Sequence, residues 1–288
     1  MKTPFFSGAC TALVTPFLDG RVNFPMLQRL LYRQMDARIR AVVICGTTGE
    51  SATLTNEEKI QLFTKAKEFV GNDCRIIAGT GSNCTASAVA LSRAAEDTGA
   101  DGLLVVSPYY NKATPAGLVA HYSAIAEAVH IPVIAYNVPS RTGVDIPVAV
   151  YRELSKIPYI AGVKEASTDI SKIAKIRAAC PDLPIWSGND DQAVAVMALG
   201  GKGVISVLSN VAPLETQAMA MAALDGDFDT ASALQLEMLP LIEALFSEVN
   251  PIPVKAAMKL LGYDCGQCRL PLTAISKENL EKLRKLLT

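Results

Sequence analysis

The sequence predicts an α/β protein built as a (β/α)8 TIM barrel with a C-terminal helical extension. Apolar runs of strand length alternate with helical segments through eight repeats, and the rest of the chain is purely helical. A length of 288 residues fits one barrel of about 250 residues with an addition. A doubly wound open sheet would show the same alternation, so it stays open as an alternative architecture.

The eight expected strands are continuously apolar instead of alternating between apolar and polar residues. A parallel strand that is buried on both faces requires this composition. The expected strands cover residues 11–16, 41–46, 75–79, 102–107, 132–137, 160–165, 184–187 and 203–207. The helical segments between them are long enough to return the chain for the next parallel strand.

Capping residues mark the helices between these strands. Residues 55–58, Thr-Asn-Glu-Glu, form a capping box, and the helix that follows is expected to end at Gly71. Asp145 is expected to cap the helix after the fifth strand, and Asp190 to begin the seventh helix. The eighth helix is expected at about residues 214–224.

The C-terminal part of the chain lacks strands. Helices are expected over residues 228–246, 254–261 and 276–287. We therefore predict a barrel of residues 1–224 and a three-helix extension of residues 225–288.

Composition and charge exclude several classes of protein. Lys and Arg number 27 against 28 Asp and Glu, so no basic surplus is available to bind nucleic acid. Every apolar run is far shorter than the roughly 18 residues of a membrane span. The N-terminal residues lack the apolar stretch of a secretion signal, and the seven cysteines are scattered. We expect a cytoplasmic protein that binds neither membrane nor nucleic acid.

The sequence predicts no metal site and no organic cofactor. Cys265 and Cys268 have the spacing of a zinc or redox pair, but no second pair of ligands accompanies them, and their role stays open. Residues 200–203, Gly-Gly-Lys-Gly, resemble a phosphate loop but precede the eighth strand, on the face of the barrel that serves stability. No GxGxxG motif follows a strand, which argues against a nicotinamide or flavin.

Polar residues gather where the predicted strands end, which is where barrels of this type carry their active sites. Five ends stand out: residues 46–50, Tyr109-Tyr110-Asn111, Tyr136-Asn137 with Arg141, Lys164-Glu165, and residues 187–190. Five such ends on one face indicate a shared site.

Lys164 is the sharpest of these signals. It follows the apolar residues 160–163 without a break, so its Cβ starts inside the barrel wall. Desolvation there disfavours the ammonium form, and an uncharged lysine is a nucleophile towards carbonyls. The alternative is a structural lysine that reaches solvent or pairs with Glu165.

The neighbouring strand ends supply complementary groups. Tyr136, Tyr110 and Thr47 carry hydroxyls that can transfer protons. Arg141 has the planar fork that suits a carboxylate. Residues 46–49 offer consecutive backbone N–H groups for a small anion.

Three motifs carry a resemblance to a known family. They are Gly-Val-Lys-Glu-Ala-Ser at 162–167, Gly-Thr-Thr-Gly-Glu at 46–50 and Tyr-Asn-Val-Pro-Ser-Arg-Thr-Gly at 136–143. Along nearly its whole length the chain resembles the dihydrodipicolinate synthase family of pyruvate-dependent Schiff-base lyases and aldolases.

The resemblance implies a reaction and a set of roles. Lys164 would form a Schiff base with pyruvate, and the enamine would attack L-aspartate 4-semialdehyde to give 4-hydroxy-tetrahydrodipicolinate for lysine and diaminopimelate biosynthesis. Tyr136 would relay protons with Thr47 and Tyr110. Within the pocket, Thr48 would hold the pyruvate carboxylate, Arg141 the semialdehyde carboxylate, and Gly188 and Ile205 would line the site with backbone groups.

The resemblance also implies a homo-oligomer and bears on regulation. Tyr110 would enter the site of a neighbouring subunit, so at least a dimer is expected, and a tetramer as a dimer of dimers. A cleft at this contact binds inhibitory L-lysine in some members. Asn56, Lys59 and Ser87 stand where those members carry ligand-binding residues. We expect weak or absent lysine inhibition.

Three rival functions remain at this stage. N-acetylneuraminate lyase and other pyruvate-dependent keto-acid aldolases resemble the chain at Lys164, but Thr47 and Arg141 favour the synthase. A glycoside hydrolase would use Glu50 and Glu165 as paired carboxylates, although the chain has a single Trp for sugar binding. A catalytically silent binding protein would be expected to lose Lys164.

Overall fold

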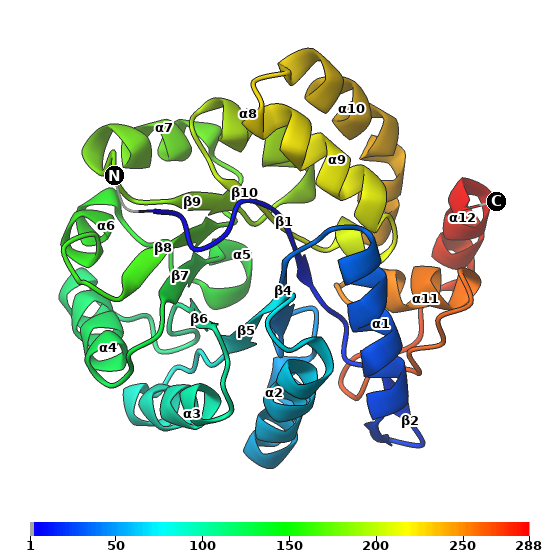
Figure 1. Cartoon of the computed structure of the whole chain (residues 1–288), viewed down its shortest axis with the longest axis horizontal. Helices are drawn as coiled ribbons and strands as arrows, with labels where there is room; N and C mark the ends of the chain where they lie inside the picture. Colours follow the sequence, from blue (N-terminus) through cyan, green and yellow to red (C-terminus); the bar gives the residue numbers. More distant parts are fainter. Residues whose placement is uncertain (1–2, 288) are drawn as a thin grey trace.

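The computed structural model describes residues 3–287 and forms a closed barrel of eight parallel strands (Figure 1). Around the barrel the strands are ordered β1-β10-β9-β8-β7-β6-β5-β4. Their bounds are β1 Gly8–Ala12, β4 Ala41–Ile44, β5 Arg75–Gly79, β6 Gly102–Val106, β7 Val133–Asn137, β8 Ile160–Glu165, β9 Ile185–Ser187 and β10 Gly203–Ser206. The predicted barrel is confirmed, and the open sheet is excluded because β1 pairs with both β4 and β10.

Helices surround the barrel on its outside. These are α1 Phe24–Asp36, α2 Asn56–Val70, α3 Thr85–Asp97, α4 Pro115–Glu127, α6 Val148–Leu154, α7 Ile170–Ala179, α8 Ala193–Ala198 and α9 Pro213–Leu224. Shorter turns are η1 Ser51–Thr53, α5 Pro139–Thr142, η2 Asp190–Gln192 and η3 Leu208–Asn210. None of the helices in residues 3–287 combines the length and the apolar character that crossing a membrane requires.

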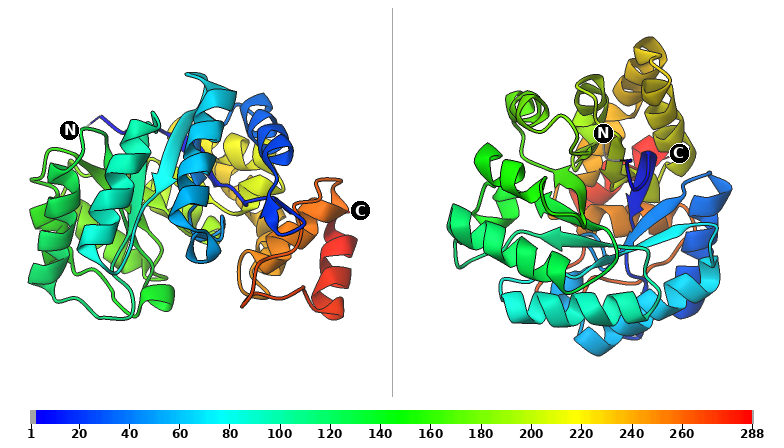
Figure 2. Two further views of the ribbon diagram at one scale, coloured as in Figure 1. Left: turned by 90° about the horizontal axis from the view of Figure 1, so that it is seen from below. Right: turned by 60° about the vertical axis from the view of Figure 1, so that its left-hand side comes forward.

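Three helices follow the barrel: α10 Phe228–Leu245, α11 Ile252–Leu260 and α12 Lys277–Leu287. Figure 2 (left) shows the orange segment that contains α11 beside the dark-blue hairpin of β2 Phe17–Leu18 and β3 Arg21–Val22. Phe17 donates its backbone N–H to the Cys265 carbonyl at 2.9 Å. The extension therefore packs on the barrel directly, and its division from the barrel at residue 224 stays a prediction.

Glycines allow the barrel to close. A Cβ on Gly203, whose φ is +144°, would lie 1.9 Å from the carbonyl oxygen of Gly8. The Gly8 N–H donates to the Lys202 carbonyl at 2.9 Å. The Gly-Gly-Lys-Gly segment thus serves the β1–β10 junction, at the N-terminal end of β10.

The first strand lies earlier than predicted. It covers Gly8–Ala12, whereas the apolar pattern placed it at residues 11–16. Small residues at its start carry little apolar signal, and beyond Ala12 the backbone leaves the strand ladder, since the Val14 N–H donates to the Asn210 side chain at 3.1 Å.

One of the three predicted helix starts needed correction, and at a second the side chain has a role that the pattern did not predict. Thr55 and Glu58 form the predicted capping box. Asp145 does not cap α6, which begins after Pro147 without a side-chain cap. Asp190 begins η2, but its carboxylate accepts from the backbone N–H groups of Val207 and Leu208 instead of capping its own helix. In both cases a long-range partner outcompetes the local cap.

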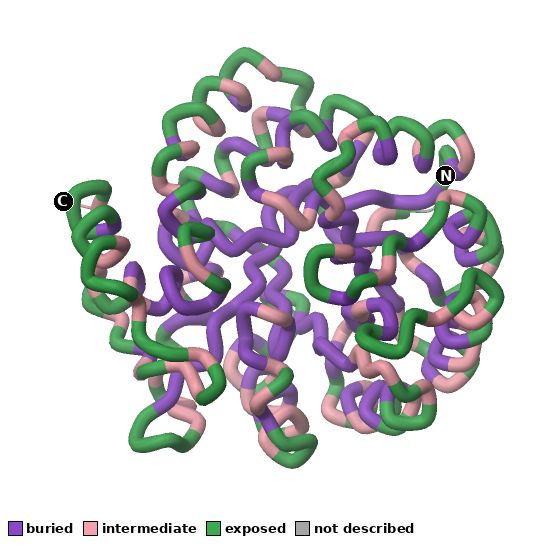
Figure 3. The backbone as a smooth tube through the Cα atoms, turned by 180° about the vertical axis from the view of Figure 1, so that it is seen from behind, coloured by how far each residue is buried: buried purple, intermediate pink, exposed green. Residues whose placement is uncertain are grey.

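The core has two layers, one inside the barrel and one between the strands and the helices (Figure 3). Inside, Trp186 stacks on Phe6 with ring centroids 4.7 Å apart and donates its indole N–H to the Phe6 carbonyl at 3.3 Å. Phe6 precedes β1 and the Trp186 ring reaches Gly162, so this plug fills the barrel on the amino-terminal side of Tyr136 and Lys164. Trp186 is therefore a core residue.

Candidate active site

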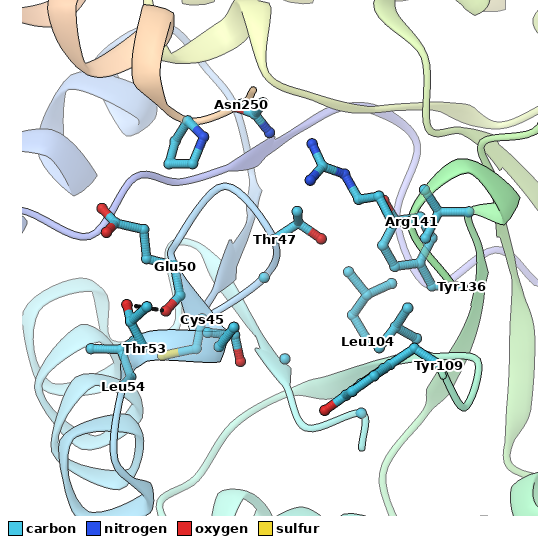
Figure 4. A pocket seen from close by; sticks show the side chains of 18 of the residues that line it. Cys45, Thr47, Glu50, Thr53, Leu54, Leu104, Tyr109, Tyr136, Arg141 and Asn250 are labelled. Carbon is cyan, nitrogen blue, oxygen red and sulfur yellow. Dashed lines mark hydrogen bonds between the residues drawn. The ribbon is translucent and has the colours of Figure 1, made fainter. Parts of the chain in front are cut away.

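A cavity of about 440 Å³ opens at the carboxyl ends of β4, β5, β6 and β7 (Figure 4). Its wall includes the predicted site residues Thr47, Tyr136 and Arg141. The extension contributes Asn250 and Leu272 to the same wall. The cavity lies on the face where a barrel of this type carries its chemistry.

Lys164 and Tyr136 are directly paired across strands β8 and β7. The Lys164 Nζ lies 4.3 Å from the centroid of the Tyr136 ring, and only 5% of Lys164 and 6% of Tyr136 is exposed. Glu165 follows Lys164 but pairs with Lys172, because successive side chains of a strand point to opposite faces. Among residues 3–287, no carboxylate forms an ion pair with Lys164. The alternative of a structural pair between Lys164 and Glu165 is wrong.

Gly188 leaves room for the Lys164 side chain. A Cβ at this position would lie 3.0 Å from the Lys164 Cε and 2.5 Å from the Ala166 Cβ. The Gly188 N–H donates to the Glu165 carbonyl at 2.7 Å, so its free backbone group is the carbonyl oxygen. Ile205 is fully buried in the barrel interior, in the cluster that contains Tyr136.

The turn after β4 presents Thr47 and Thr48. Cys45 and Glu50 flank it with left-handed backbone, each at φ +57°. The Thr48 hydroxyl is buried and accepts a hydrogen bond from the Asn250 side chain at 2.9 Å. Within the described residues, the backbone N–H groups of Thr47 and Thr48 donate to no protein oxygen. Two free N–H groups in one turn form a concavity for a small anion.

Arg141 points into the cavity from α5, a single helical turn that the sequence reading did not predict (Figure 4). Gly143, at φ +69°, ends this turn. Arg141 is exposed, and among residues 3–287 no carboxylate pairs with it. Its guanidinium is free for a ligand carboxylate.

The cavity wall does not include the predicted site residues Thr48, Tyr110, Lys164, Gly188 and Ile205, and of these Tyr110 is the one that lies in solvent. It is 89% exposed, whereas its neighbour Tyr109 is 40% exposed and lies on the cavity wall. The Tyr110 backbone is left-handed at φ +73°, and its N–H donates to the Thr142 carbonyl at 3.4 Å. A strained, exposed tyrosine at the rim is typical of a functional position.

A sequence profile of the Dihydrodipicolinate synthetase family matches residues 5–288. The chain belongs to this family. It is 48% identical over 285 residues to the 4-hydroxy-tetrahydrodipicolinate synthase of Caldicellulosiruptor saccharolyticus, covering 99% of this chain and 97% of that protein.

Solved structures of family members have the same fold. The dihydrodipicolinate synthase of Aquifex aeolicus is 43% identical and superimposes with a TM-score of 0.96, covering 98% of this chain and 97% of the other. A chloride-inhibited dihydrodipicolinate synthase from Acinetobacter baumannii, solved in complex with pyruvate, is 40% identical with a TM-score of 0.96 and 98% coverage of both chains.

Asn250 is a site residue that the sequence reading missed. It lies on the cavity wall of this family member and donates to Thr48 across 202 positions of the chain. The only local signal is a polar residue before Pro251, in a segment read as a separator between helices. A contact of such sequence separation leaves no pattern that periodicity could detect.

The two carboxylates that a glycoside hydrolase would need are both occupied. Glu50 accepts from the Lys255 Nζ and from the Arg269 backbone N–H, each at 2.8 Å. Glu165 accepts from the Tyr151 hydroxyl at 2.7 Å and from the Asn137 side chain at 2.8 Å. Neither is free to act as acid, base or nucleophile, so the hydrolase alternative has no support in this family member.

Cys265 and Cys268, whose role the sequence left open, lack the features of a reactive site. Burial raises the pKa of the Cys265 thiol to about 12 and that of Cys268 to about 11, so both hold their protons at neutral pH. No group of three or more His, Cys, Asp and Glu in residues 3–287 is arranged to hold a metal ion.

Proposed function

We propose that this chain condenses pyruvate with L-aspartate 4-semialdehyde through an imine on Lys164, giving 4-hydroxy-tetrahydrodipicolinate. The observation that carries the proposal is the buried Lys164 amine against the Tyr136 ring at the carboxyl end of the barrel. Relatives of the same name at 48% identity support the choice of substrates.

The chemistry requires a nucleophilic amine and groups that move protons. Attack of the Lys164 amine on the pyruvate ketone forms the imine and releases water. Loss of a proton from the methyl carbon gives an enamine, which forms the new carbon–carbon bond to the aldehyde. The amino group of the semialdehyde then attacks the imine carbon, closing the ring and releasing Lys164. In this scheme Tyr136 and Thr47 transfer the protons.

The two carboxylates of the substrates need separate partners. The free N–H groups of the Thr47-Thr48 turn suit the pyruvate carboxylate. The Arg141 guanidinium suits the carboxylate of the semialdehyde. Gly188 and Ile205 would contact the ligand by backbone groups.

The proposal also includes the oligomeric state and the cellular compartment. Tyr110 would complete the site of a second subunit, in a dimer that associates further to a tetramer. All seven cysteines are free thiols, which supports a reducing compartment such as the cytoplasm.

Trapping the imine tests the proposal. Borohydride with pyruvate is expected to add one reduced pyruvyl group, located on Lys164 by peptide mass spectrometry. Lys164→Ala should abolish both the label and turnover, while Lys202→Ala, which removes a lysine at the opposite end of the barrel, should change neither. An unlabelled Lys164, or a label that persists in Lys164→Ala, would contradict the mechanism.

A further inference from the structure

Strands β7 and β8 carry a second pair of residues directly after the Tyr136–Lys164 pair. Asn137 lies opposite Glu165 in the register. Because side chains alternate along a strand, this pair points away from the barrel interior, towards the helices. Both side chains are buried, with Asn137 at 0% and Glu165 at 1% exposure.

The Glu165 carboxylate is held by groups from β7, α6, α7 and the turn after β8. Its Oε1 accepts from the Asn137 amide at 2.8 Å and from the Ser167 N–H at 2.9 Å. Its Oε2 accepts from the Tyr151 hydroxyl at 2.7 Å and faces the Lys172 Nζ at 3.6 Å. A fully satisfied buried network of this kind is rigid.

The same network closes the loop that carries Arg141. The Asn137 Oδ1 accepts from the Ile146 N–H at 3.0 Å, and its Nδ2 donates to Asp145 at 2.8 Å. Lys172, on α7, contacts Asp145 as well as Glu165. Residues 138–145 therefore form a loop that is closed by the Asn137 side chain, since Asn137 precedes the loop and bonds to Asp145 and Ile146 at its end.

We propose that Asn137, Glu165 and Lys172 are positioning residues that fix Arg141 relative to Lys164. The inference rests on the proposed function, in which Lys164 holds the first substrate and Arg141 the second. Glu165 is bonded to Lys164 in the chain, so the network joins the two binding groups through one rigid unit. Misplacing a binding group by about 1 Å can cost about 100-fold in rate.

Asp145→Ala and Lys172→Met test this role. The Asp145 side chain is 55% exposed, so its removal frees the loop without opening the core. We expect the KM for aspartate 4-semialdehyde to rise between about 10- and 100-fold in both variants, with the rate of pyruvate trapping by borohydride within about twofold of wild type. Lys172→Arg restores the cation and should recover most of the loss.

Lys156→Met is the matched control, because Lys156 forms an exposed pair with Glu153 on α6. It should leave both parameters unchanged. A proportional fall of trapping and semialdehyde use in Asp145→Ala, or no change in either, would overturn the inference. Absence of pyruvate trapping in the wild-type protein would instead overturn the proposed function, so the two failures are distinguishable.

Discussion

Adjacent residues in β8 have opposite surroundings. Lys164 faces the barrel interior with no carboxylate partner in the described chain, while Glu165 faces the helices and is saturated by hydrogen bonds. An unpaired buried amine is available for covalent chemistry, whereas a saturated carboxylate is available for holding structure. Because successive side chains of a strand point to opposite faces, the reactive Lys164 and the structural Glu165 can be neighbours in the chain.

The Tyr136 hydroxyl can be tested apart from the ring. Tyr136→Phe retains the ring that packs against Lys164, so the fold and Tm should be kept. Turnover should fall by about 10²- to 10⁴-fold if the hydroxyl transfers protons. Steady-state rates with saturating substrates measure the loss. Near wild-type turnover would show that the hydroxyl is only structural.

Much of the site could be read from residues at strand ends, because in a barrel these positions converge on one face. Thr47 follows β4, whereas Tyr136 and Arg141 stand at the end of β7, and all three lie on one cavity wall. Asn250 could not be found in this way, because its contact with Thr48 depends on how the extension packs. The role expected for Tyr110 involves a second subunit, and in the single chain its side chain lies in solvent.

At the scale of elements, buried strands were predicted well and strand ends less well. β5 and β8 have the predicted bounds, because each is a continuous apolar run that ends at a polar or glycine-containing turn. β1 was displaced because its first residues are small, and the cap at Asp145 was misread because its carboxylate serves Asn137 and Lys172. Tertiary partners of this kind override local propensity.

A buried ion pair joins the extension to the turn after β4. Lys255 of α11 and Glu50 lie 2.8 Å apart, with side-chain exposures of 3% and 0%. Lys255→Met would leave the Glu50 charge without its cation, which should reduce the free energy of unfolding by about 3–5 kcal/mol. Urea denaturation measures this loss.

Lys259→Met, on the same helix, is the control for this substitution. Lys259 pairs with Asp264 at 2.9 Å, but both side chains are more than half exposed. Its loss should cost less than about 1 kcal/mol. Equal effects of the two substitutions would contradict a special role for the buried pair.

We expect the cleft that the resemblance assigns to lysine inhibition to bind L-lysine poorly in this chain. Lys59 is half-buried on the cavity wall and has no carboxylate partner among residues 3–287. Ser87 is exposed and offers no charge. L-Lysine would meet a cation and find no partner for its ammonium, so desolvation of the ligand would be uncompensated.

We expect half-inhibition only above about 1 mM L-lysine, which corresponds to a binding free energy weaker than about −4 kcal/mol. Steady-state assays with saturating pyruvate measure this. Ser87→Glu supplies a countercharge and should strengthen inhibition. Half-inhibition well below 1 mM in the wild-type protein would mean that other residues of the cleft recognise lysine.

Exchange of subunits between two inactive variants can test whether the exposed Tyr110 acts in the site of a neighbouring subunit. If Tyr110 of one subunit completes the Lys164 site of another, neither Lys164→Ala nor Tyr110→Phe alone has a complete site. In a mixed dimer, however, the subunit with intact Lys164 receives an intact Tyr110 from its partner. Random exchange makes half of the dimers mixed, each with one good site of two, so about one quarter of wild-type activity should return.

The two variants should each sediment as an oligomer of at least two subunits, and activity should appear only after they are mixed under conditions that allow exchange. A matched mixture of Lys164→Ala with Tyr136→Phe is the control. The structure pairs Tyr136 with Lys164 within one chain. In this mixture every subunit lacks one of the two groups, so no site is complete after exchange and no activity should return. Recovery in the first mixture alone assigns Tyr110 to the neighbouring site. Equal failure of both mixtures despite demonstrated exchange, or a fully active monomer, would mean that Tyr110 has no role across the contact.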